Sequence, residues 1–145
     1  MPATGRDLRR RVFLAALAAP VFAASQESPL DFITKMASAL SEGNGLAFLD
    51  RVDHRMPDYQ TLERNILALT AQNEVLSSVE RLKDEGDENT RNLELDWFLQ
   101  IRSRETNGGI ERRRQTVKCG IERQKKKWKV MSLAPVSLFA PPVPR

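Results

Sequence analysis

Few residues of this chain have the types and spacing that chemistry requires. The sequence of 145 residues contains one histidine, His54, and one cysteine, Cys119. A zinc or transition-metal site needs several spaced His, Cys, Asp or Glu ligands, and this pair does not supply a set. We therefore expect no metal and no cofactor. The sequence also lacks a Gly-x-Ser-x-Gly elbow and a P-loop, so neither nucleophilic catalysis nor phosphate binding has a motif.

Arginines form the most prominent charged cluster. Arg102, Arg104, Arg112 and Arg114 flank a turn expected at residues 107–109. A three-residue turn there would set Arg104 opposite Arg112 and Arg102 opposite Arg114, and like charges in direct opposition are unfavourable. We therefore expect a β-bulge near the hairpin end, or an anion or partner held by these arginines; solubilising strand ends are the alternative. Few aromatic residues interleave with the basic runs, so a nucleic-acid platform is not indicated.

The elements that must position these residues change in type near Asn73. Before it, apolar residues recur at helical spacing and predict helices over residues 29–43, 45–52 and 57–70. After it, apolar residues alternate and predict strands beginning near residues 75, 93, 110 and 128, with an acidic loop over 84–89 and a turn near 124–127. Helices followed by one antiparallel sheet make an α+β domain.

The second predicted strand has one apolar face and one polar face. Its neighbour in the hairpin should be paired in a register that keeps the apolar rows together, with Trp97 opposite Cys119 and Leu99 opposite Val117. Glu94 and Asp96 have the opposite parity and should point away from the helices. Cys119 alternates with polar positions, so we expect a buried thiol rather than a nucleophile. The apolar face is formed by Leu93, Leu95, Trp97, Leu99 and Ile101.

This succession of elements resembles a known superfamily. It comprises an opening helix with DFITKMASALSEGN, a helix after MPDYQTLERNILAL, a strand starting at VLSSV, a long hairpin and a closing KKKWKVMSL. Over residues 29–139 it resembles the nuclear transport factor 2-like superfamily, which shares its fold with SnoaL-like cyclases and ketosteroid isomerases. The resemblance implies a cystatin-like cone, with three N-terminal helices packed on a strongly bent antiparallel sheet around a cavity. Members include enzymes, small-ligand binders and dimerising modules, so the resemblance informs fold more than function.

The resemblance also implies where a ligand or substrate would lie. The best candidates for lining the cavity are Tyr59, Trp97, Leu99, Val117 and Cys119. Enzymes of this type use a carboxylate or histidine inside an apolar cavity, where burial tunes its pKa for proton transfer. The weak catalytic candidates in this chain are His54, Asp58 and Tyr59, with Asp31 as an outsider. Each has a structural alternative: a solvated histidine, an aspartate at a helix start and a core tyrosine.

The first residues predict an export signal. Three arginines, residues 9–11, precede an apolar run from Val12 to Ala24, with small residues placed for cleavage after Ala23. This run is shorter than the roughly 20 residues that span a bilayer, so we expect no stable membrane anchor. The sequence RRVFL from Arg10 also resembles a twin-arginine pattern, and the general secretory route remains open. We expect a periplasmic or extracellular protein.

The predicted organisation is therefore a signal peptide over residues 1–23, a domain over 24–139 and a Pro-rich tail over 140–145. Removing the signal lowers the formal charge from +4 to +1, which argues against a general affinity for nucleic acid. We expect a non-catalytic domain that binds a small apolar ligand or a partner protein. The alternatives are an isomerase, dehydratase or cyclase, and a homodimer that pairs through the outer sheet face carrying Phe98 and Met131.

Overall fold

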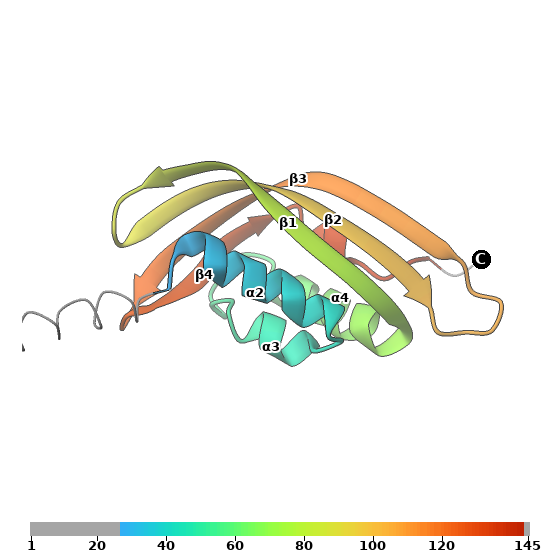
Figure 1. The fold of residues 1–145 in the computed structure, drawn as a ribbon. Coiled ribbons are helices and arrows are strands. Elements are labelled where there is room, and N and C mark those ends of the chain that lie inside the picture. Colours follow the sequence, from blue (N-terminus) through green and yellow to red (C-terminus); the bar gives the residue numbers. More distant parts are fainter. Residues whose placement is uncertain (1–26, 144–145) are drawn as a thin grey trace, which may run out of the picture.

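Helices and strands form two layers. The computed structural model describes residues 27–143. Three helices, α2 (Pro29–Ser41), α3 (Gly45–Leu49) and α4 (Tyr59–Gln72), lie beneath the concave face of a strongly curved antiparallel sheet (Figure 1). The sheet contains β1 (Asn73–Gly86), β2 (Thr90–Ser103), β3 (Ile110–Gln124) and β4 (Lys127–Ala134), in the order β1-β2-β3-β4. The predicted α+β class is confirmed, while the predicted signal peptide lies outside the described residues.

Helix α2 begins and ends where its sequence predicts. The Asp31 N–H donates to the Ser28 side chain at 3.1 Å, and Pro29 occupies the first turn, where it has no N–H to leave unsatisfied. The helix ends before Gly43, whose φ of 72° suits glycine. One face of the helix is buried against the sheet and α3, through Phe32, Ile33, Met36, Ala37, Ala39 and Leu40.

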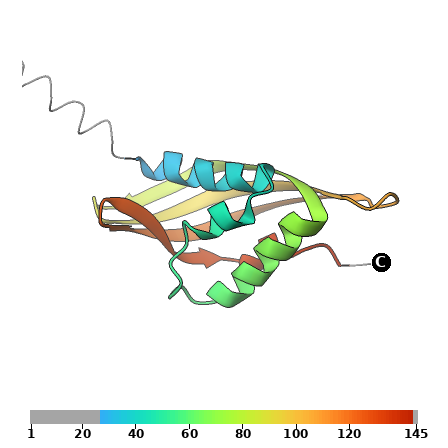
Figure 2. The ribbon, with the colours of Figure 1, turned by 90° about the horizontal axis from the view of Figure 1, so that it is seen from below.

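The short helix α3 crosses α4 closely. A Cβ placed on Gly45 would approach Thr70 Oγ1 to 2.9 Å and Ile66 Cγ2 to 3.1 Å, so glycine permits this approach. Figure 2 shows α4 running obliquely to α2 on the same side of the sheet. Helix α4 then passes directly into β1 at Asn73, whose buried side-chain amide donates to the Leu69 carbonyl at 3.1 Å.

The sheet register differs from the prediction by four residues. Trp97 lies opposite Gln115, and Cys119 lies opposite Leu93. The predicted three-residue turn is wrong, because β2 ends at Ser103 and a longer connection leads to Ile110. The shift is even in number, so the apolar residues of both strands still face the helices.

The new register also removes the predicted clash of arginines. Arg102 lies opposite Ile110, Arg112 opposite Gln100, and Arg114 opposite Phe98. The bulge expected near this hairpin end is absent from the β2–β3 pairing. Register shifts occur instead in the β1–β2 pairing, after Arg81, and in the β3–β4 pairing, after Gly120.

Two segments expected to be loop or tail are part of the packed structure. Strand β1 continues through the acidic segment to Gly86, so only residues 87–89 connect it to β2. At the other end, the 3-10 helix η1 (Val136–Phe139) carries the fully buried Phe139. The Arg113 guanidinium donates to the Leu138 and Ala140 carbonyls at 2.7 and 2.6 Å, and thereby fixes the start of the predicted tail.

Candidate functional site

The interior of the cone is filled by aromatic side chains. The Trp97 ring centroid lies 5.1 Å from Phe139 and 6.4 Å from Phe48, and the two phenylalanines are 5.4 Å apart. The Trp97 indole N–H donates to Ser77 Oγ at 2.9 Å, which satisfies its one polar atom. Trp97, Phe48 and Phe139 have no exposed surface.

The residues predicted to line a cavity therefore lie in this packed core. Trp97, Leu99, Val117 and Cys119 are buried, and Tyr59 packs at the edge of the core. None of them borders either of the two pockets described below. Burial raises the pKa of the Cys119 thiol to about 12, so this thiol is protonated at neutral pH, as expected for a structural cysteine.

The weak catalytic candidates gather at the surface where α4 begins. The His54 and Tyr59 rings are 4.7 Å apart, and His54 is exposed. Burial and the nearby Glu63 raise the pKa of Tyr59 above its usual value. Asp58 precedes α4 with a φ of 64° and makes no side-chain capping bond. Asp31 lies apart from them, in the first turn of α2.

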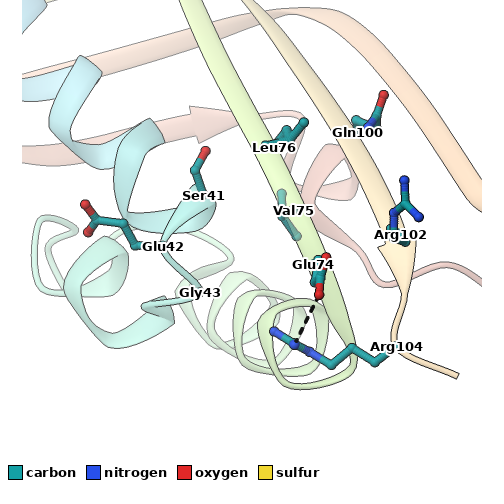
Figure 3. Close-up of a pocket in the computed structure, with 9 residues that line it drawn as sticks. All are labelled: Ser41, Glu42, Gly43, Glu74, Val75, Leu76, Gln100, Arg102 and Arg104. Carbon is teal, nitrogen blue, oxygen red and sulfur yellow. Dashed lines mark ion pairs between the residues drawn. The ribbon is translucent and has the colours of Figure 1, made fainter.

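An open groove wraps around the edge strand β1. It has a volume of about 500 Å³ and is shown in Figure 3. The end of α2 forms one wall, the start of β1 forms the floor, and the end of β2 forms the other wall. We call this the β1 groove; its residues are Ser41, Glu42, Gly43, Glu74, Val75, Leu76, Gln100, Arg102 and Arg104.

A single hydroxyl fixes the α2 wall to the edge strand. The Ser77 N–H donates to Ser41 Oγ at 2.9 Å, and this hydroxyl donates to the Ser77 carbonyl at 3.3 Å. Because the outward-facing groups of Ser77 are satisfied in this way, part of the edge is protected from pairing with another strand. Leu76, which precedes Ser77, is 58% exposed on the floor of the groove.

The four arginines predicted to form an anion or partner surface have different surroundings. Arg102 lines the groove and makes no ion pair within residues 27–143, whereas Arg104 lies 4.0 Å from Glu74. Arg112 donates to the Gln100 side chain at 3.1 Å. Arg114 donates from Nε and Nη2 to the Asp96 carboxylate at 3.1 and 2.7 Å, which holds the pKa of Asp96 below its usual range. Arg102 is therefore the arginine best placed to bind a partner.

The walls of this groove could not be found from sequence. Glu42 ends a helix, Glu74 begins a strand and Gln100 lies in the next strand. Nothing in their spacing indicates that they meet, because tertiary packing of α2 against the edge of the sheet brings them together. Arg102 was detectable, because it is one of four arginines that flank the predicted turn.

A second pocket of about 600 Å³ lies where α2 begins. Two arginines line it, and each contacts a neighbouring side chain. Arg91 donates to Asp84 at 2.9 Å, and the Arg123 guanidinium lies 4.2 Å above the Trp128 ring. The other lining residues are Glu27, Ser28, Pro29, Glu88 and Asn89. Arg123 also donates through Nε to the Glu88 carbonyl at 3.0 Å, but its buried Nη1 has no hydrogen-bond partner within the described residues.

The described part of the chain contains neither a metal-binding cluster nor a membrane-spanning helix. Residues 27–143 contain no group of three or more His, Cys, Asp or Glu side chains that could hold a metal ion. No helix within the same residues is both long and apolar enough to cross a membrane.

Comparison with known proteins identifies the fold. No family model matches the chain, and no curated protein matches it. Among solved structures, it is similar to a nuclear transport factor 2-like superfamily protein from Salmonella enterica, with 10% identity and a TM-score of 0.55 over 70% of this chain and 84% of that one. A conserved protein from Planctomyces limnophilus gives 7% identity and a TM-score of 0.59 over 67% and 83%. Aln2 from a Streptomyces species has 10% sequence identity and a TM-score of 0.54, over 75% of this chain and 91% of that one. The chain thus has the cone fold of the nuclear transport factor 2-like superfamily.

Proposed function

We propose that this chain is an exported, non-catalytic domain that binds an acidic segment of a partner protein in the β1 groove. The observation that supports this is a contrast between two places in the molecule. The interior, where this fold could hold a ligand, is filled by contacting aromatic rings, whereas the groove is open and contains Arg102, which makes no ion pair with any described residue.

The groove offers a specific combination of contacts. The Arg102 guanidinium can donate to a carboxylate, and a planar guanidinium matches that group well. Leu76 offers exposed apolar surface on the floor. Glu42 lies on the α2 side of the groove and favours a basic rather than a second acidic group there. Glu74 lies on β1, opposite Arg102 in the sheet and 4.0 Å from Arg104. A short segment with an acidic and an apolar side chain fits this arrangement.

Site-specific photo-crosslinking in the exporting host would test the proposal. A photoreactive residue at Leu76 should capture a partner, and the capture should be lost when Arg102 is changed to Glu. Leu82 supplies the matched control, because it lies on the same strand and is 54% exposed, against 58% for Leu76, but does not line the groove. Equal capture from both positions, or capture that survives Arg102→Glu, would contradict the proposal.

Export is part of the proposal and depends on residues 1–23. The measurement is the mass of the chain recovered outside the cytoplasm, which should correspond to cleavage after Ala23. Lysine in place of Arg10 and Arg11 should block export if the twin-arginine route is used, and should leave export unchanged in the general secretory route. Recovery of only the uncleaved chain from the cytoplasm would contradict export.

A homodimer through the outer sheet face is the second candidate. Within residues 27–143 the helices cover the concave face, and Phe98 and Met131 are only half-buried on strands β2 and β4. Sedimentation velocity should then show a dimer that Phe98→Glu dissociates. A monomer at all concentrations would exclude this candidate and would leave the groove proposal intact.

A further inference from the structure

The turn between β3 and β4 contains two strained lysines. Gln124 pairs with Lys127, so Lys125 and Lys126 alone make the turn. Their φ angles are 50° and 71°. Two-residue turns with positive φ at both positions strongly prefer Asn and Gly, because a Cβ in the left-handed region is destabilising.

No intramolecular contact explains why lysines stand there. Within residues 27–143, the side chains of Lys125, Lys126 and Lys127 make neither an ion pair nor a hydrogen bond, and all three residues are exposed. A strained conformation that is kept without a compensating contact points to a role outside the folded domain.

The charge around the turn has one dominant sign. From Glu122 to Lys129 the sequence contains five basic residues and one acid. Two of the five are engaged, since Arg123 lies over Trp128 and the Lys129 ammonium donates to the Asp50 carbonyl. Lys125 and Lys126 of the turn and the adjacent Lys127 remain for an external partner. Asp53, the nearest other acid on the facing loop, is bonded to Arg55 and to Gln124.

The position of the turn suggests which partner that is. The Trp128 indole N–H donates to the Glu27 carbonyl at 2.9 Å, so the described chain begins beside the residue that follows Lys127. Figure 1 shows the start of α2 and the β3–β4 turn at the same end of the molecule. The residues before Glu27 include the apolar run 12–24, predicted to enter a bilayer during export. Insertion of that run into a bilayer would bring Lys125, Lys126 and Lys127 near the membrane surface.

We propose that Lys125, Lys126 and Lys127 dock the domain reversibly onto an anionic phospholipid surface. Basic residues near such a surface are attracted to its negative potential, and the attraction decays within a Debye length. This docking site is separate from the β1 groove, because it lies at another end of the sheet. The lysines remain in the chain after the apolar run is removed, so we expect docking to persist.

Vesicle co-sedimentation would test this with the chain from Ala24 to Arg145. That chain retains the whole core, which extends from Phe32 to Phe139. It should bind vesicles of phosphatidylcholine mixed with phosphatidylglycerol at low salt, and should be released from them at high salt. Changing Lys125 and Lys126 to Gln should weaken binding about 25-fold, at about fivefold per lysine. Changing both to Arg should preserve it.

A second variant separates docking from a structural role. Lys125→Asn with Lys126→Gly supplies the residues that the turn prefers, so it should raise the unfolding midpoint and also weaken vesicle binding. Arg102→Gln, at the β1 groove, is the control that should bind vesicles normally. The proposal is overturned by equal binding to neutral vesicles or by unchanged binding of the Gln variant. Neither of these results affects the crosslinking test of the groove.

Discussion

Replacing Phe139 with alanine would remove one of the three aromatic rings that fill the cone. Phe139 has no exposed surface and touches both other rings, with centroid distances of 5.1 Å to Trp97 and 5.4 Å to Phe48. Truncating a buried phenylalanine costs about 3–5 kcal/mol through lost transfer energy and the cavity that remains. The tilted and edge-on ring contacts place Phe139 toward the upper part of that range. We therefore expect a loss of about 4 kcal/mol.

Equilibrium unfolding in urea, followed by Trp97 and Trp128 fluorescence, would measure this loss. Folded domains have about 5–15 kcal/mol of stability. A loss of about 4 kcal/mol should therefore leave a measurable transition unless the wild type lies at the low end of that range. Val143→Ala is the matched control, because Val143 is 83% exposed and should change little. Benzene should partly restore the stability of Phe139→Ala, since an apolar void stays dry and accepts such a ligand. A loss below about 1 kcal/mol would refute the packed interior and revive a natural ligand cavity at that position.

Three further predictions concern other parts of the fold. Ser41→Ala should lower the free energy of unfolding by about 1 kcal/mol, because the backbone groups of Ser77 lose their hydrogen-bond partner. Ser38→Ala, at an exposed position of the same helix, should lower it less. Urea unfolding of both variants measures the difference, and equal losses would contradict the role of the Ser41 hydroxyl. The Cys119 thiol stays protonated in the folded state to about pH 12 but ionises near pH 9 when unfolded, so its contribution is complete below pH 9 and falls by about 1.4 kcal/mol per pH unit above it. Wild type should lose stability between pH 9 and 11 relative to Cys119→Ala, and parallel profiles would show that burial does not shift this pKa. Asn and Gly at positions Lys125 and Lys126 should stabilise the protein by about 1–2 kcal/mol by thermal unfolding, and an unchanged midpoint would mean that the turn is not strained.

The sequence predicts most of the fold because local signals and face periodicity agree. Ser28 and Pro29 mark the start of α2, and the alternation through Trp97 assigns the buried face of β2. The register was not predictable in the same way. Hairpin register depends on the geometry of the connection, and the glycines at 108 and 109 suggested a tighter turn than the one that forms.

The candidate site was less predictable than the fold. Arg102 could be recognised as one of the arginines flanking the predicted turn, but the groove that contains it also needs Glu42 and Leu76, which approach it only in three dimensions. The interior illustrates the opposite problem. Phe139 is the last residue of the predicted domain, and only its packing against Phe48 and Trp97 shows that it lies in the space where a ligand was expected.

The bond between Trp128 and Glu27 has a consequence for the order of folding. Its two residues are 101 positions apart, so it joins the first described residue to the last strand. The sheet itself is a meander in which each strand pairs with the next, and such local hairpins can form early. Helix α2 must wait for them, because the strands that bury its apolar face are synthesised after it. Helix α2 can pack once β1 has formed, but the bond that ties Glu27 to Trp128 forms only after β4 has emerged, when translation is nearly complete.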